Sequence, residues 1–421
     1  MSVRSIAAGF ACFAATLVLV PSCGSTLDSL GCSERTGDSS ADGGVVLARL
    51  VGPASYANAF RDLLGKTDSE IATKVASAFD HLFHGDPDDE AIYFESGTDQ
   101  AYVLDVLHDQ VRSEGIGLGM LIAVQLDKRD EFDRLWRYAR ANQVKAGSAH
   151  GYFPSFCQET SGDVECYDPF GMQQIAASLL LARGRWQASP GTIDYGREAG
   201  DLLDLIRNKE TYNCGVVDGV TAVFDAEADL PYDTPTTASL GVSRPSIVLP
   251  AYYELWWQAT GDDFWSQAAA AARVYWQASA DPITGLVPRR ATFDGTPVAG
   301  FDTFASECHR TFFNMALDRI WNGSAPWVVD ESDRVLRFFY DQGLTRYGQE
   351  YSLDGTLIQS LHDMSLVAAN GALALAATTD HRTDFVSEVW NLDTPTGDGR
   401  YYAGIMRMLA LVVLSGQMRV Y

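Results

Sequence analysis

The chain has 421 residues, with 55 acidic against 31 basic side chains and a formal net charge of -24 at pH 7. This charge repels polyanions, so the composition excludes nucleic acid as a partner and fits a neutral substrate. Beyond the first residues, no apolar run is long enough to span a membrane.

The first 23 residues have the pattern of a signal peptide. Arg4 supplies the positive start, an apolar run covers residues 6–20, and small residues precede Cys23. The sequence before Cys23 resembles a bacterial lipobox, which predicts a lipid on this cysteine after cleavage. Pro21 is unusual in that box, so plain secretion is the alternative. We therefore expect an exported protein, in the periplasm or at the cell surface, that meets the membrane only through a lipid on Cys23.

Two segments of different composition follow this signal. Residues 24–45 are rich in Ser, Gly, Asp and Thr, a composition that cannot bury a core and predicts a flexible tether. Residues 46–421 have the length of one large folded domain.

The cysteines of the domain are candidates for disulfides, because an exported protein can form them. Cys157 and Cys166 flank a short polar loop and are the best pair. Cys214 with Cys308 is a second candidate. No cysteine pair has the spacing of a zinc site, so we expect neither a metal nor a cofactor.

Helical patterns of two kinds alternate along the domain. Amphipathic patterns predict outer helices over residues 69–83, 131–144, 194–207, 262–278, 331–340 and 383–390. Largely apolar patterns predict buried helices over residues 115–126, 172–181, 247–259, 311–321, 364–377 and 402–414. Six such pairs predict an all-α fold, an (α/α)6 toroid of six helical hairpins, and the lack of βαβ alternation disfavours an α/β barrel. Short strands are expected in the loops 145–170, 208–245 and 279–300.

One acidic residue, Glu114, lies where a charged loop meets the first buried helix. Residues 111–119 read Val-Arg-Ser-Glu-Gly-Ile-Gly-Leu-Gly, and the alternate glycines allow close backbone approach. Burial at the mouth of an apolar helix favours the protonated form of a carboxyl, as a general acid needs. The alternative is an acid that satisfies backbone donors at the start of its helix.

This stretch, continued through residues 119–128, resembles glycoside hydrolase family 8. Further blocks agree in order, among them Leu249–Trp256, Ser352–Gly355 and Arg400–Tyr402. Within the family, the sequence is most similar to the reducing-end xylose-releasing exo-oligoxylanases. The resemblance covers nearly the whole domain and implies a helical toroid, in agreement with the alternation of helices.

The resemblance implies an inverting hydrolysis by two carboxyl groups, in which an acid protonates the leaving oxygen while a base activates water. Glu114 matches the acid of the family. Glu307 falls where the family has an aspartate base, and its extra methylene would move the oxygens by about 1 Å. The alternative is that Glu307 only pairs with Arg310 at the start of a helix.

Two positions depart from the family pattern. The aspartate that holds the sugar at the cleavage subsite aligns with Phe170, although Asp168 would reach the sugar if the loop were reshaped. A tyrosine close to the attacking water is replaced by Ile247. Both changes would weaken binding of the transition state.

Three further residues match substrate-binding positions of the family. Arg112 and Arg310 would orient the carboxyl groups by bidentate contacts, or would only anchor helix ends. His362 matches a histidine that contacts the reducing-end sugar in the exo-acting relatives, or it caps the helix that follows.

We therefore expect an inverting hydrolase of β-1,4-linked xylo-oligosaccharides that releases xylose from the reducing end. The expected catalytic residues, followed by the substrate-binding ones, are Glu114, Glu307 and Asp168, then Arg112, Arg310 and His362. The alternatives are a catalytically degenerate glycan-binding lipoprotein, and a family 8 hydrolase of β-glucan or chitosan.

Overall fold

The computed structural model describes residues 47–155, 167–186, 191–323 and 326–421. The expected signal peptide, the tether and the Cys157–Cys166 pair lie outside these ranges. Within them, no helix combines the length and the apolar character that crossing a membrane requires.

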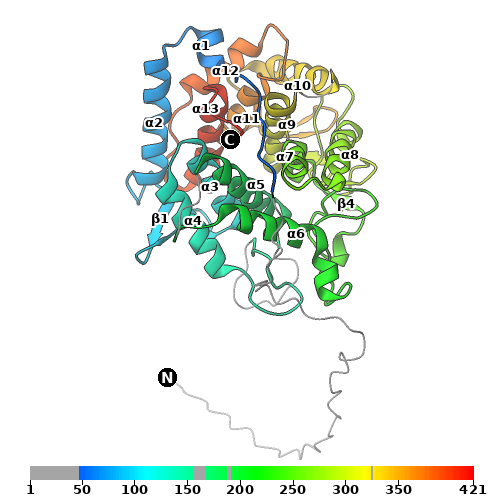
Figure 1. Ribbon diagram of the computed structural model, residues 1–421. Coiled ribbons are helices and arrows are strands. Elements are labelled where there is room, and N and C mark those ends of the chain that lie inside the picture. The colour runs from blue at the N-terminus through cyan, green and yellow to red at the C-terminus, as the bar shows by residue number, and fades with distance from the viewer. Residues whose placement is uncertain (1–46, 156–166, 187–190, 324–325) are drawn as a thin grey trace, which may run out of the picture.

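Two rings of helices form the fold (Figure 1). The inner ring consists of α3 (Ser113–Gln125), α5 (Pro169–Arg185), α7 (Pro250–Thr260), α9 (His309–Asn322), α11 (Met364–Leu373) and α13 (Arg400–Leu414). The outer ring consists of α2 (Asp68–His84), α4 (Arg129–Asn142), α6 (Tyr195–Asn213), α8 (Asp263–Ser279), α10 (Pro326–Gly343) and α12 (Arg382–Asn391), and a short helix α1 (Ala59–Leu64) precedes them. The (α/α)6 toroid predicted from the sequence is confirmed.

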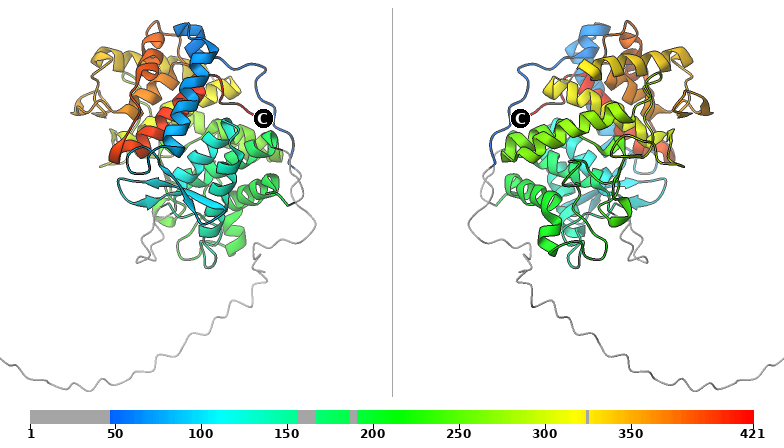
Figure 2. Two further views of the ribbon diagram at one scale, coloured as in Figure 1. Left: turned by 90° about the vertical axis from the view of Figure 1, so that its left-hand side faces the viewer. Right: turned by 90° about the vertical axis from the view of Figure 1, so that its right-hand side faces the viewer.

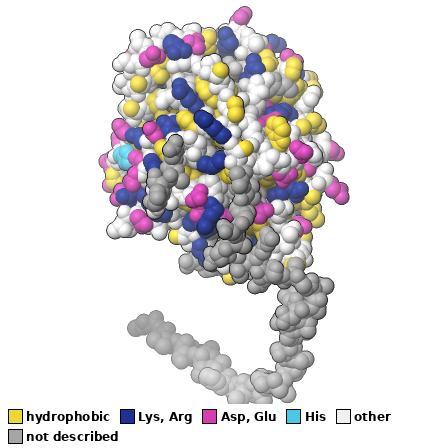
Figure 3. Space-filling model, viewed as in Figure 1, with side chains coloured by type: hydrophobic (Ala, Val, Ile, Leu, Met, Phe, Trp, Pro, Cys, Tyr) yellow, Lys and Arg dark blue, Asp and Glu magenta, His cyan; other side chains and the backbone are white. Residues whose placement is uncertain are grey.

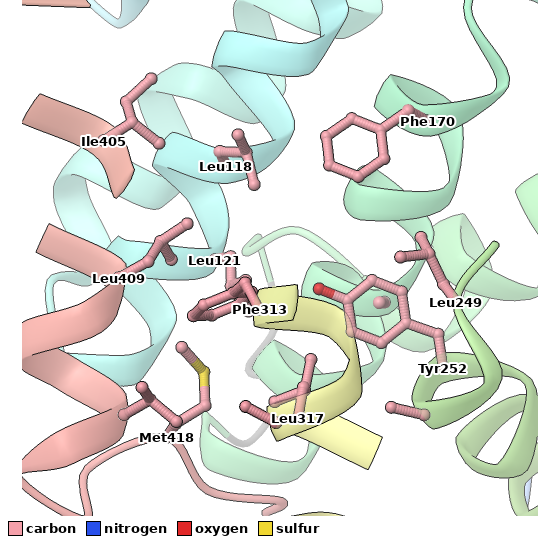
Figure 4. Packing of buried hydrophobic residues seen from close by; sticks show 14 of the residues in the cluster. Leu118, Leu121, Phe170, Leu249, Tyr252, Phe313, Leu317, Ile405, Leu409 and Met418 are labelled. Atoms are coloured by element: carbon pink, nitrogen blue, oxygen red, sulfur yellow. The ribbon is translucent and has the colours of Figure 1, made fainter. Parts of the chain in front are cut away.

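Side-chain pattern explains which helices lie inside. In α3 every residue except Glu114 is buried, so this helix has no polar face to turn toward water. Its Leu118 and Leu121 meet Phe313 of α9 and Leu409 of α13 in the core (Figure 4). An outer helix instead buries one stripe at helical spacing, and in α4 this stripe is Phe132, Leu135, Trp136 and Ala139.

Short strands connect the helices at several places. The strands β1 (Tyr93–Ser96), β2 (Gln100–Asp105) and β3 (Gln110–Val111) form one antiparallel sheet, and β6 (Thr303–Phe304), β7 (Glu350–Ser352) and β8 (Leu357–Gln359) form another. The pair β4 (Val242–Ser243) and β5 (Ala291–Thr292) lies in the loops where strands were expected. The two three-stranded sheets lie outside these loops and were not predicted. Most of their strands have two to four residues, and β2, with six, is apolar at all four positions 101–104, so its sequence shows no period-two pattern. Hairpin β1–β2 and the C terminus lie at opposite ends of the toroid (Figure 2).

The cysteine prediction that falls within the described residues is wrong. Cys308 is a buried free thiol, whereas Cys214 is disulfide-bonded, so these two residues do not pair. Cys308 lies in the turn that leads into inner helix α9, and Cys214 caps the end of outer helix α6. Sequence spacing did not reveal that the two residues belong to different rings.

The surface carries charges of both signs despite the acidic total. On the face shown in Figure 3, Lys and Arg side chains stand beside Asp and Glu. Some pair along outer helices, as Arg134 does with Asp130 at 2.7 Å in α4. Exposed pairs of this kind contribute only about 0.5 kcal/mol each to stability. The net charge therefore acts mainly on solubility and on the choice of partners.

Candidate active site

The start of α3 positions Glu114. Arg112 is the N-cap residue and Glu114 lies in the first turn, with 16% of its side chain exposed. The glycines of this stretch allow neighbouring helices to approach: a Cβ on Gly117 would lie 2.6 Å from the Gln174 Cβ of α5. At Gly115 it would lie 2.8 Å from the Tyr401 hydroxyl of α13. Close packing thus fixes the helix end that holds the carboxyl group.

A buried arginine from α9 contacts this carboxyl group. Arg310 Nη1 donates to Glu114 Oε2, and the arginine side chain is only 7% exposed. Its guanidinium lies over the Phe170 ring of α5, 4.3 Å from the ring centroid. The cation–π contact with Phe170 holds the guanidinium in place, and Arg310 therefore orients the Glu114 carboxyl group through its hydrogen bond.

Glu307 lies in the 3-10 turn Ser306–Cys308 that leads into α9. Arg289 Nε donates to Glu307 Oε1 at 2.7 Å. Burial raises the pKa of Glu307, but the hydrogen bonds from Arg289 and from its own backbone N–H, with the charge of Arg310, outweigh burial and leave the pKa below its ordinary value. Glu307 is therefore ionised at neutral pH, the state that a general base requires.

One pocket of about 310 Å³ brings the two carboxyl groups together. It opens where α3, α9 and α13 begin, beside the loop that joins β2 and β3. Its lining consists of Asp105, Leu107, His108, Arg112, Glu114, Ser306, Glu307, Arg310, Asp398, Gly399, Tyr401 and Tyr402. An acid and an ionised base in one open pocket are what an inverting glycoside hydrolase needs.

Comparison with known proteins agrees with this geometry. The model of the glycosyl hydrolases of family 8 matches residues 107–416. The chain belongs to glycoside hydrolase family 8. It is therefore a glycoside hydrolase, and the enzymes of this family invert the anomeric centre.

Relatives in family 8 match over most of their length. Rex8A of Paenibacillus barcinonensis, a reducing-end xylose-releasing exo-oligoxylanase, is 33% identical over 381 residues, 87% of this chain and 97% of the relative. The corresponding enzyme of Halalkalibacterium halodurans is 32% identical over 378 residues, 87% and 94% of the two chains. The structure of Rex8A complexed with xylose superposes with a TM-score of 0.80 at 34% identity, over 87% of this chain and 98% of that one. A family 8 xylobiose complex from Teredinibacter turnerae gives 0.81 at 31% identity, with the same coverage.

Asp168 lies beside this family 8 pocket and does not line it. Its carboxylate caps α5 by accepting from the Phe170 N–H at 3.1 Å, and it accepts from Arg244 Nη2 at 3.1 Å. The negative charge of Asp168 nonetheless raises the pKa of Arg310, so the two side chains are near each other. Because a cap and an ion pair hold Asp168, it does not reach into the pocket in this structure.

Of the other predicted residues, one lines the pocket and one does not. Arg112 lines the pocket, where its Nε contacts Asp105 Oδ2 at 2.9 Å and its Nη2 donates to Gln110 Oε1 at 2.9 Å. His362 is not part of the lining. Its Nδ1 lies 3.0 Å from the Tyr347 carbonyl oxygen and its ring packs edge-on against the Tyr347 ring, and these contacts hold the side chain away from the pocket. The structure thus brings together Glu114, Glu307, Arg112 and Arg310.

Several lining residues were not predicted as site residues. Tyr402 is the most informative, because its hydroxyl donates to the Ser306 carbonyl oxygen at 3.3 Å, next to Glu307. Burial raises the pKa of the Tyr402 phenol well above its usual range, so this group is a neutral hydrogen-bond donor. Ile247, where the resemblance implies a tyrosine, is fully buried and is not among the residues that line the pocket. The only sequence signal for Tyr402 was its place in the Arg400–Tyr402 block.

Proposed function

We propose that this family 8 hydrolase cleaves β-1,4-linked xylo-oligosaccharides and releases xylose from the reducing end. The observation that carries the proposal is the single pocket lined by both Glu114 and Glu307. The exo-oligoxylanase relatives support this substrate, because they match along 94–97% of their own length. Endoglucanase C of Ruminiclostridium cellulolyticum is 28% identical, and the match covers 63% of that protein. A β-glucan substrate therefore has the weaker support.

The proposed reaction assigns one proton transfer to each carboxyl group. Water attacks the anomeric carbon while the bond to the leaving oxygen breaks, and the Glu307 carboxylate accepts the proton of the water. Glu114 gives its proton to the leaving oxygen, which becomes a hydroxyl of the released xylose. Attack on the face opposite to the leaving group converts a β linkage into an α product. Exchange with solvent then restores both carboxyl groups.

A time course of xylotriose hydrolysis by proton NMR tests this function. We expect xylose and xylobiose in equal amounts, with the new reducing end of xylobiose appearing first as the α anomer. Xylotriose with a reduced end should resist cleavage, because release from the reducing end requires an intact sugar there. Cellotriose serves as the control substrate. Faster cleavage of cellotriose, or absence of products from xylotriose, would contradict the proposed substrate.

Removal of Arg289 should shift the pH profile of the reaction. The base acts as a carboxylate, so kcat/KM falls as pH drops through the pKa of Glu307, which lies below its ordinary value. In Arg289→Gln the contact at 2.7 Å is lost, the pKa of Glu307 rises, and the acidic limb should move up by about one pH unit. Arg290→Gln is the matched control, since both arginines lie over the Phe301 ring but Arg290 pairs with Asp233. Equal shifts in the two variants would argue against Glu307 as the base.

We also propose that the protein is exported and held at a membrane by a lipid on Cys23. The signal-like residues 1–23 and the tether-like composition of 24–45 support this location. Expression of the full chain in a bacterial host should give a membrane-associated protein that incorporates labelled palmitate. Cys23→Ser should lose the label and move to the soluble fraction. Labelling that persists in Cys23→Ser would contradict the assigned lipid site.

A further inference from the structure

A second pocket lies between α2, α12 and α13, on the outer wall of the toroid. It has a volume of about 470 Å³ and shares no lining residue with the active-site pocket. Its lining consists of Ser69, Glu70, Thr73, Lys74, Ser77, Ala78, Trp390, Thr394 and Arg407. Nothing in the proposed hydrolysis uses this pocket.

Arg407 belongs to the same inner helix as Tyr402 of the active site but faces another way. The two residues are five positions apart, so their side chains differ in direction by about 140° around α13. Arg407 is only 5% exposed, and its Nε donates to the Leu392 carbonyl oxygen at 3.4 Å. Burial lowers the pKa of Arg407, and the charge of Asp393 opposes this effect.

Lys74 and Lys66 add positive charge beside this arginine. Their Nζ atoms lie 5.1 Å and 4.7 Å from the centroid of the Trp390 ring. Burial lowers the pKa of Lys74, and the charges of Arg407 and Lys66 lower it further. Three cations are thus close enough to repel one another.

The carboxylates near these cations make no close ion pair with Lys74 or Arg407. Glu70 lines the pocket, but its carboxylate accepts from the Thr67 N–H at 2.8 Å and from the Thr67 hydroxyl at 2.6 Å. Asp393 attracts Arg407 only from a distance, because among the described residues no carboxylate oxygen lies within 4.0 Å of a side-chain nitrogen of Lys74 or Arg407. An unpaired, partly desolvated cation costs stability, so the cluster favours any anion that enters the pocket.

We propose that this pocket binds the anionic group of an acidic sugar, a hexuronate or a sugar phosphate. Arg407 and Lys74 would hold the carboxylate or phosphate by charge-assisted hydrogen bonds. The hydroxyl groups of Ser69, Thr73 and Ser77 offer donors and acceptors for the sugar hydroxyls. The volume suits a monosaccharide and is larger than a lone phosphate needs. This inference goes beyond the proposed hydrolysis and does not depend on it.

Isothermal titration calorimetry with the full chain tests the site. Glucuronate and glucose 6-phosphate are the probes, and glucose and inorganic phosphate are the controls. We expect at least one acidic sugar to bind, glucose not to bind, and phosphate to bind more weakly than glucose 6-phosphate. The stronger acidic probe identifies whether a carboxylate or a phosphate is preferred.

Variants locate the binding site. Arg407→Gln and Lys74→Gln should each weaken binding about tenfold or more, as expected for loss of a hydrogen bond to a charged group. Arg197→Gln, which removes an exposed arginine of α6, should leave the affinity unchanged. Glu114→Gln should also leave it unchanged, because that residue lines the other pocket.

The Lys74→Gln variant should fold like the wild type. Lys74 is only half-buried, and its replacement removes a cation that Arg407 and Lys66 repel. We expect this variant to melt at or above the wild-type temperature without ligand, and to lose the stabilisation that the acidic sugar gives. The proposal fails if neither acidic sugar binds at about 10 mM, or if both pocket variants bind like the wild type. If glucuronate does not bind, binding of inorganic phosphate as tight as that of glucose 6-phosphate would also overturn it, because the sugar would then contribute nothing.

Discussion

Glu114→Gln is expected to lower kcat/KM for xylotriose about 10³-fold. A neutral amide keeps the shape of the side chain and still accepts from Arg310, but it has no proton to give to the leaving oxygen. The leaving group of a xylo-oligosaccharide is a sugar alkoxide, which departs very slowly without protonation. Initial rates measured by anion-exchange chromatography of the products would give this loss directly.

Binding and the split between kcat and KM separate the loss of an acid from a loss of folding or binding. The affinity of Glu114→Gln for xylotriose, measured by calorimetry, should stay within a few-fold of the wild type. The loss should therefore fall on kcat, because the proton is needed only as the bond to the leaving oxygen breaks. A loss carried by KM, with kcat unchanged, would contradict the role of Glu114 as general acid.

The fold could be predicted because the two rings of helices differ in their side-chain pattern. A helix such as α3, with one charged residue among apolar and glycine positions, has no stable place on the surface. A helix such as α4, with its buried stripe from Phe132 to Ala139, has no stable place in the core. Alternation of the two types along the chain leaves few arrangements besides a double ring. The strands of the two three-stranded sheets were not predicted. The hairpin of β1 and β2 is local but shows no clear alternation, whereas β6 pairs with β7 from a distant segment.

Residues of the candidate site could be predicted only where neighbouring positions in the sequence, or a motif of the family, indicate a chemical role. Glu114 was a candidate because charge, glycines and an apolar helix meet at one point of the chain, but this pattern left a structural role open, and the family resemblance was needed to expect the acid. Glu307 needed the family resemblance, since a single glutamate before a helix is common. Tyr402 and Asp398 reach the pocket because closure of the toroid places the start of α13 beside α3, and no local pattern reports that closure.

Phe170 stands where the family resemblance implies an aspartate, and it contacts the arginine of the site. An aspartate at this position would compete with Glu114 for the charge of Arg310, whereas the Phe170 ring lies under the guanidinium and offers its π face. Asp168, two residues earlier, contacts Arg244 instead. Arg310 therefore donates to Glu114, and its charge also acts on Asp168 and Glu307, so the phenylalanine leaves the two carboxyl groups of the pocket with their arginine contacts.

Glu307→Ala is expected to lower kcat/KM for xylotriose about 10³- to 10⁴-fold, because the variant lacks the carboxylate that is assigned to take the proton of the attacking water. Added formate or azide should restore part of the rate by entering the space of the missing carboxylate. Asp302→Asn, which changes an exposed carboxylate nearby, is the control and should keep full activity.

Glu307→Asp tests whether the position of the base or only its charge matters. Aspartate would draw the oxygens back by about 1 Å from the contact that Arg289 makes at 2.7 Å. A misplacement of this size can cost about 100-fold, so we expect an activity between those of the wild type and Glu307→Ala. Stopped or continuous assays with xylotriose at the pH optimum would rank the three proteins.

If Glu307→Ala keeps wild-type activity, or if formate gives it no rescue while it stays folded, another residue must activate the water. If Glu307→Asp instead exceeds the wild type, the pocket has kept the geometry of an aspartate base and Glu307 is a poorly placed replacement.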